Sequence, residues 1–130
     1  MKPGKFLLVF VFIFYGLSTG AQKLIPVDYG WSRNSINTAV FRKNSITSFK
    51  NTQFIAFYNA EGMVVLGKRN INSKLWQLKK TKYKGNVADA HNVITIAVDG
   101  DGFLHIAWDH HGNKLRYCKS IAPYSLQLTE

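Results

Sequence analysis

The 130-residue sequence contains very little cysteine, since Cys118 is its only one. A single cysteine cannot form a disulfide within the chain. This excludes the small secreted folds that a framework of disulfides holds together. Cys118 lies in a run in which apolar and polar residues alternate, so we expect it to be a small packed side chain.

Acidic residues are also scarce, with 7 Asp and Glu against 17 Lys and Arg and a formal net charge of +10. For a protein outside the cytoplasm, this charge favours polyanionic partners such as acidic polysaccharides, cell envelopes or free nucleic acid. A solvated basic surface with no such partner would give the same count. Charge alone therefore leaves both interpretations open.

The longest apolar run, residues 6–17 (FLLVFVFIFYGL), is too short to cross a bilayer, which takes about 20 residues. Two lysines precede it and the small residues of STGAQ follow it, which is the layout of a secretory signal peptide. We therefore predict a signal peptide at residues 1–21, cleaved between Ala21 and Gln22. The protein is then secreted or periplasmic, with no membrane attachment after cleavage. A membrane anchor is the alternative.

The remaining sequence shows no long apolar pattern of helical period, so we predict an all-β fold with little helix. Short runs rich in Val, Ile, Phe, Tyr and Thr alternate with breaks of Asn, Gly and Lys. We expect strands at Thr38–Phe41, Ser45–Phe49, Gln53–Tyr58, Met63–Lys68, Trp76–Lys80, Val93–Val98, Phe103–Trp108 and Leu115–Lys119.

The sequence repeats weakly at a spacing of 50 residues. When 53–70 is aligned with 103–120, an aromatic residue near the end of one strand and the glycine of the next turn coincide in the two units. About four short strands in a unit of this length are typical of a β-propeller blade. We therefore predict antiparallel four-stranded blades of a β-propeller, of which this chain contains about two.

A propeller ring needs at least four blades, so we expect the chain to be part of a longer protein. In this interpretation, residues 22–130 are the N-terminal part of the propeller domain, and the remaining blades are missing. Blade 1 spans about 31–85, and an incomplete blade 2 spans about 88–130. A self-contained all-β domain is the alternative, although it would leave sheet faces and edges exposed.

All the histidines of the chain lie in one predicted hairpin, at His91, His105, His110 and His111. If the turn DGDG (99–102) places Val98 opposite Phe103, then His91 lies opposite His110. We therefore expect His91 to meet the His110–His111 pair at the end of the hairpin away from the turn. His105 lies in the middle of a strand, where packing is the expected role.

Imidazoles gathered at strand ends can transfer protons near neutral pH, bind a metal or donate hydrogen bonds to sugars. A metal site of His91, His110 and His111 is one alternative, and a purely structural cap of the hairpin is another. We interpret DGDG as a tight turn rather than a calcium loop, because further acidic ligands are lacking. We interpret the lysines of 74–85 as the outer edge strand of a blade rather than a polyanion track.

The stretch AHNVITIAVDGDGFLHIAWDHHGNKLRY (90–117) resembles the secreted BNR-repeat (BNR-4 type) β-propeller proteins of polysaccharide-degrading bacteria, which include ulvan lyases. The resemblance covers roughly residues 30–130, including GWSRNSINTAVF and AFYNAEGMVVLGKRNINSKLWQL. Its most specific part is the His-Asn, DGDG, Leu-His and His-Gly-Asn series. No clean Asp-box signature is present, which argues against a sialidase. The resemblance implies a seven-bladed ring with an active site on one face.

The resemblance also implies β-elimination in an acidic, uronic-acid-containing polysaccharide such as ulvan. Its two site histidines match His91 and His111, the first for proton transfer and the second for the substrate carboxylate, although these roles could be exchanged. Asn92 and His110 would bind substrate, and a tyrosine and an arginine from later blades would complete the site. We expect the fragment alone to be inactive, with no nucleic acid as partner and no cofactor, and leave a structural metal ion open. The alternatives are a non-catalytic carbohydrate-binding propeller and a glycoside hydrolase on the same scaffold.

Overall fold

The computed structural model describes residues 23–33 and 44–129. The regular elements in these ranges are all β-strands. The predicted signal peptide and the predicted strand at Thr38–Phe41 lie outside the described residues. The other predicted strands are present with ends shifted by at most two residues, except that the strand predicted at Trp76–Lys80 ends four residues later. They are β1 (Ile46–Phe49), β2 (Thr52–Tyr58), β3 (Met63–Asn70), β4 (Gln77–Lys84), β5 (Ile94–Val98), β6 (Leu104–Trp108) and β7 (Tyr117–Lys119).

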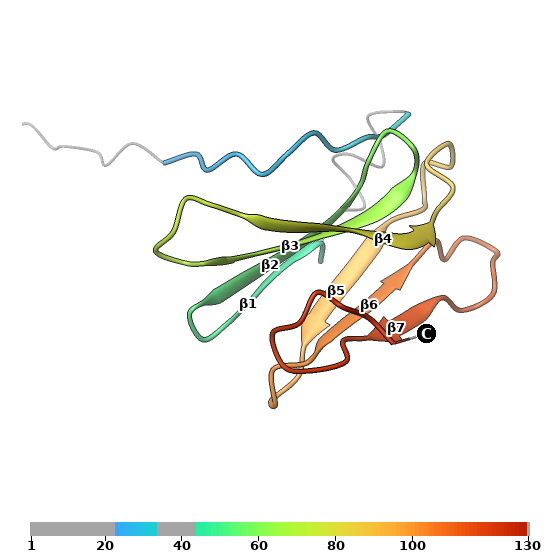
Figure 1. Cartoon of the computed structure of the whole chain (residues 1–130). Helices are drawn as coiled ribbons and strands as arrows, with labels where there is room; N and C mark the ends of the chain where they lie inside the picture. The colour runs from blue at the N-terminus through green and yellow to red at the C-terminus, as the bar shows by residue number, and fades with distance from the viewer. Residues whose placement is uncertain (1–22, 34–43, 130) are drawn as a thin grey trace, which may run out of the picture.

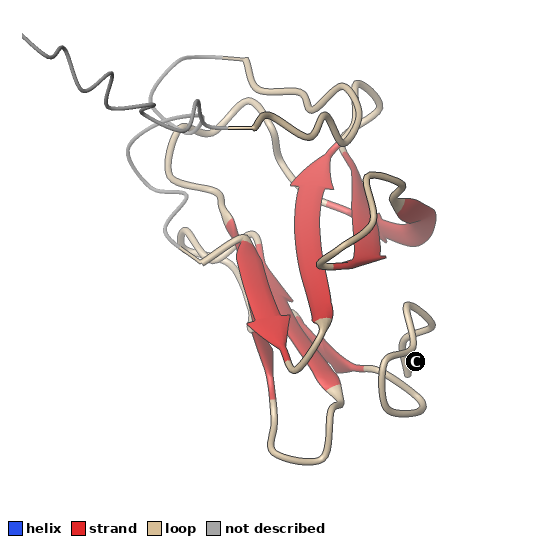
Figure 2. Cartoon of the chain, turned by 90° about the vertical axis from the view of Figure 1, so that its left-hand side faces the viewer, coloured by secondary structure: helices blue, strands red, loops and turns tan. Residues whose placement is uncertain are grey.

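The strands form two antiparallel sheets, one of order β1-β2-β3-β4 and one of order β5-β6-β7 (Figure 1). After β7 the chain returns alongside it and forms a bridge between Ser120 and Leu128, where a fourth strand of the second sheet is expected. Figure 2 shows the sheets as two separate layers. The predicted all-β fold with successive propeller blades is therefore confirmed, while the number of blades in the ring stays a prediction. Within the described ranges no helix is long and apolar enough to span a bilayer.

The spacing of 50 residues is visible in the backbone. A shift by 50 places β2 on β6 and β3 on β7. Gly62 and Gly112 occupy the same place in the two units and have nearly the same positive φ, 75° and 73°. A side chain would be strained in this left-handed conformation, which explains why both turns use glycine.

The core lies between the two sheets, where β5 contacts β1 and β2. Alternate side chains of β2 and β6 point into it, as expected for strands with one buried face. Among the described residues, the cluster consists of Phe54, Ala56, Tyr58, Val64, Leu66, Ile94, Ile96, Leu104, Ile106, Trp108, Cys118 and Leu126. Cys118 is thus a buried free thiol, as predicted.

β4 lies at the edge of the first sheet and continues to Lys84, four residues beyond the predicted end. The sequence did not indicate this extension, because every side chain of β4 is at least partly exposed and their polarity gives no alternating signal. Backbone pairing with β3 keeps the segment extended, up to Met63 opposite Lys84, with an irregularity between Met63 and Val65. The position at the edge agrees with the interpretation of its lysines as protection against edge-to-edge pairing.

The register of the β5–β6 hairpin differs by one residue from the prediction. Val98 pairs with Leu104, not with Phe103. The turn has three residues, because Asp99 N donates to Phe103 O (3.1 Å) and Gly102 adopts φ +87°. The predicted pairing of His91 with His110 is therefore wrong. The observed register, continued beyond the strand ends, places His91 opposite His111.

Candidate functional site

The site begins with a tight segment of chain between β4 and β5. Asp89 N donates to Asn86 O (3.2 Å) and Asn92 N donates to Asp89 O (3.3 Å), so two successive turns shape residues 86–92. The side chain of Asp89 adds an Asx turn, in which Oδ1 accepts a hydrogen bond from His91 N at 2.9 Å. These bonds fix the Asp89 carboxylate beside the backbone that carries His91.

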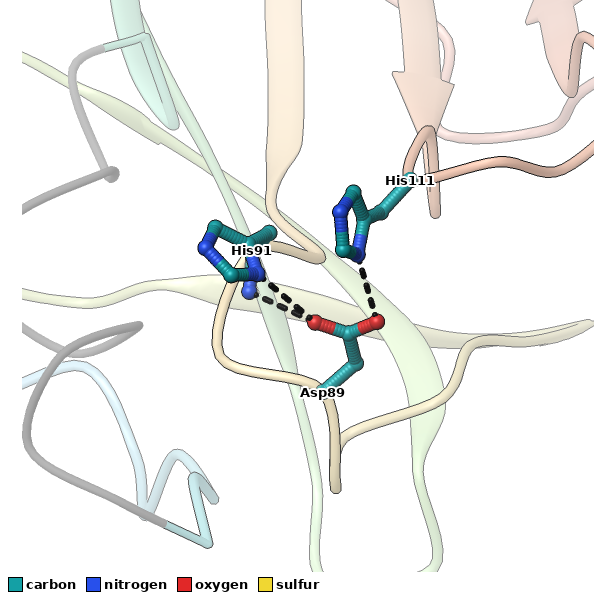
Figure 3. Close-up of side chains that lie close together, drawn as sticks. All are labelled: Asp89, His91 and His111. Carbon is teal, nitrogen blue, oxygen red and sulfur yellow. Dashed lines mark hydrogen bonds and ion pairs between the residues drawn. The ribbon is translucent and has the colours of Figure 1, made fainter.

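Asp89 brings the two predicted catalytic histidines together (Figure 3). Its Oδ1 lies 3.2 Å from His91 Nδ1, and its Oδ2 lies 2.7 Å from His111 Nδ1. The centroids of the two imidazole rings are 4.3 Å apart. One carboxylate therefore orients two imidazoles, one from the loop before β5 and one from the loop after β6.

The charge of Asp89 determines which nitrogen of each imidazole carries the proton. The hydrogen bond from His111, followed by the one from the backbone of His91, lowers the pKa of Asp89 to about 2. The ionised carboxylate can only accept hydrogen bonds, so the network assigns the donated proton to Nδ1 of both rings. In a neutral imidazole this leaves Nε2 as the unprotonated, basic nitrogen.

Both imidazoles are open to solvent while the carboxylate is more protected. The side chains of His91 and His111 are 54% and 52% exposed, against 25% for Asp89. A substrate can therefore approach the rings from outside, and the carboxylate supports them from within the loop. This arrangement resembles the acid–base dyads in which a carboxylate fixes the tautomer of a histidine.

Asp109, which follows β6 directly, holds the two loops of the site together. Its side chain is only 3% exposed. Oδ1 accepts a hydrogen bond from Asn86 N at 2.8 Å, and Oδ2 lies 3.0 Å from Arg116 Nη1. Because Asn86 begins the loop of Asp89 and Asp109 lies two residues before His111, this buried carboxylate positions Asp89 relative to His111.

The predicted substrate-binding residues His110 and Asn92, and His105, for which packing was expected, lie outside the cluster. His110 points elsewhere, and its Nε2 accepts a hydrogen bond from Arg116 N at 3.0 Å. Asn92 is 1% exposed and donates from Nδ2 to Asn86 O, so it stabilises the conformation of the 86–92 loop. His105 lies on β6 between Tyr117 Oη (2.6 Å) and Asp99 Oδ2 (3.0 Å).

Sequence reasoning missed both carboxylates. For Asp89 a local signal exists, because an aspartate two residues before a histidine can form the Asx turn that is observed here. Its contact with His111 spans 22 residues and depends on the hairpin register. Asp109 directly follows the predicted strand Phe103–Trp108, and no pattern in the sequence indicated that its carboxylate would be buried.

Comparison with protein families agrees with this architecture. The model of the BNR repeat-containing family matches residues 52–130, which is more than half of the chain. The chain belongs to this family. Its histidine pair lies within the matched residues, at the end of the β5–β6 hairpin.

A solved structure with the same fold is described as a polysaccharide lyase of a new family, PL25, and as an ulvan lyase. The TM-score is 0.57 with 16% sequence identity, over 70% of this chain and 26% of that one. At this identity the likeness shows the fold, and the BNR-repeat chain spans about a quarter of the length of the lyase. A comparison with curated proteins gives no match.

Proposed function

We propose that this BNR-repeat protein acts outside the cytoplasm on an acidic, uronic-acid-containing polysaccharide such as ulvan, and cleaves it by β-elimination. The observation that carries the proposal is the pair of solvent-open imidazoles oriented by one ionised carboxylate. The basic net charge of the chain, +10, favours a polyanionic substrate. The fold shared with a polysaccharide lyase supports the same reaction class.

In the proposed reaction a base removes the proton from C5 of the uronic acid. The C5 electron pair forms a C4=C5 double bond, the bond from C4 to the glycosidic oxygen breaks, and that oxygen takes a proton from an acid. His91 suits the proton transfer, because its Nδ1 faces Asp89 and its Nε2 is the basic nitrogen. His111, when protonated on both nitrogens, would donate from Nε2 to the uronate carboxylate while its Nδ1 donates to Asp89 at 2.7 Å.

Asn92 and His110, which the sequence resemblance implies as further substrate-binding residues, remain predictions. His110 is exposed, but its Nε2 contacts the backbone of Arg116, so its ring would have to turn to contact substrate beside the pair. Asn92 is buried, so its effect on binding would act through the shape of the 86–92 loop. A tyrosine and an arginine from other blades complete the proposed site.

The test incubates the complete protein with an acidic, rhamnose-containing polysaccharide and records the ultraviolet absorbance of the unsaturated uronate. We expect His91→Ala to abolish turnover and leave the circular dichroism spectrum unchanged, whereas His105→Ala retains turnover. Binding without an unsaturated product would indicate a carbohydrate-binding propeller. Saturated products would indicate a glycoside hydrolase. Full activity of the His91→Ala variant would show that the site is assigned to the wrong residue.

A further inference from the structure

We propose that Asp89, His91 and His111 form a binding site for a divalent transition-metal ion of the zinc class. Each of the three side chains offers one ligand atom, and these atoms all lie within 4.8 Å of one another. The site differs from the set of three histidines considered from the sequence. Asp89 takes the place of His110, whose Nε2 is bonded to the backbone of Arg116.

The spacing of the ligand atoms suits a small ion. Zinc binds imidazole nitrogen and carboxylate oxygen at about 2.0–2.2 Å, so two ligands of a tetrahedral ion are about 3.4 Å apart. The Nδ1 atoms of His91 and His111 lie 3.2 and 2.7 Å from their respective oxygens of Asp89. To admit the ion, His91 and His111 would have to move away from their oxygens of Asp89 by about 0.2 and 0.7 Å. Ligand atoms of the set that lie farther apart, up to 4.8 Å, would have to move closer together.

The donor set selects the class of metal. Two imidazoles and one carboxylate are typical of sites for zinc and other divalent transition metals, whereas calcium prefers six to eight oxygen ligands. The side chains of both histidines are about half exposed, so one side of the site is open to water or to a substrate oxygen. Three protein ligands and an open position are the pattern of catalytic zinc sites.

The protein already provides the outer support that a metal site needs. The backbone N–H of His91 holds Asp89 Oδ1 at 2.9 Å, and buried Asp109 holds the start of the same loop through Asn86 N. Such contacts orient the ligands before the metal arrives. His105 and Asp99, at 3.0 Å, also form a histidine–carboxylate pair, but the other ring nitrogen of His105 contacts the hydroxyl of Tyr117. This pair therefore lacks the second imidazole of the proposed metal site.

Metal binding and proton acceptance exclude each other in this site. The ion needs the lone pair of Nδ1, so the proton of each neutral imidazole moves to Nε2. Nε2 is then a donor and no longer a base. The metal site itself does not depend on the proposed lyase function, and its test requires no substrate.

The experiment titrates zinc into the complete, metal-free protein in competition with a chromophoric indicator, and repeats the titration with cobalt to record its visible absorption. The variants Asp89→Asn, His91→Gln and His111→Gln should each lose one site or bind it more than about tenfold more weakly, since even the loss of an outer partner costs 10- to 100-fold. The control variants His110→Gln and His105→Gln should bind as the wild type does. Circular dichroism verifies that every variant is folded.

Two results would overturn the proposal. One is a wild-type protein that binds no more zinc than Asp89→Asn. The other is equal zinc affinity in His111→Gln and His110→Gln, because these neighbours differ in whether they face Asp89.

Discussion

Removal of the charge of Asp109 tests how the two loops of the site are held together. Asp109→Asn keeps the size of the side chain and tolerates the observed φ of +62°, because asparagine adopts this conformation readily. Its Oδ1 can still accept the hydrogen bond from Asn86 N. The position next to Arg116 then holds an amide N–H, which cannot accept a hydrogen bond from the guanidinium.

The expected cost follows from the burial of the two partners. Asp109 is 3% exposed and Arg116 is 41% exposed, so the guanidinium can turn to water whereas the new amide cannot. Loss of one hydrogen bond to a charged group costs about 1.5–3 kcal/mol. We expect Asp109→Asn to lower the free energy of unfolding by about 2 kcal/mol, which is less than the cost of removing one partner of a fully buried ion pair.

The assay is urea unfolding followed by tryptophan fluorescence, with Glu61→Gln as the matched control. Glu61 forms an ion pair with Lys80 at 3.1 Å in which both side chains are more than half exposed, so its loss should not change stability measurably. If Asp109→Asn destabilises the protein no more than Glu61→Gln does, Asp109 does not hold the loops and the reasoning fails.

Three further predictions concern the β5–β6 turn, the stability of the fold at acid pH and the effect of zinc on turnover. Gly102→Ala should lower the free energy of unfolding by about 1–3 kcal/mol, because residue 102 has a φ of +87° and the added Cβ would lie 3.2 Å from Phe49. Gly100→Ala is the control: it has open space around it and should cost less than about 0.5 kcal/mol. Equal costs for the two variants would contradict the turn geometry. Because the pKa of Asp89 is lowered to about 2 from 3.8, its ionised form stabilises the fold above pH 3.8 and this contribution is lost as the pH falls toward 2, so Asp89→Asn should flatten the fall in unfolding free energy at acid pH. Parallel curves for the two proteins would contradict this. If the lyase proposal holds, zinc should lower turnover and a chelator should restore it, and activation by zinc would refute the tautomer argument.

The strands and their grouping into two similar sheets could be predicted from the sequence, because both follow from local patterns of residue type. Short runs rich in Val, Ile, Phe, Tyr and Thr between breaks of Asn, Gly and Lys indicated the strands, and the structure buries Phe54, Ala56 and Tyr58 on one of them. The repeat of 50 residues indicated two similar sheets. These features follow from side-chain periodicity, which the sequence displays directly.

The candidate site depended on details that the periodicity does not contain. The left-handed Gly102 makes the hairpin loop one residue shorter than predicted, and this shift decides that His111, rather than His110, faces His91. Asp89 lies outside both strands of the hairpin. Its role therefore becomes visible only when the register brings His111 to its carboxylate.

The central claim is that Asp89 holds the protons of His91 and His111 on Nδ1 and leaves Nε2 basic. The most direct measurement is nitrogen-15 NMR of the imidazoles in the metal-free protein at a pH where both rings are neutral. The account predicts protonated Nδ1 and unprotonated Nε2 for both residues, and a mixture of tautomers in Asp89→Asn. Protonated Nε2 on either ring of the wild type, or no change in the variant, would contradict the account.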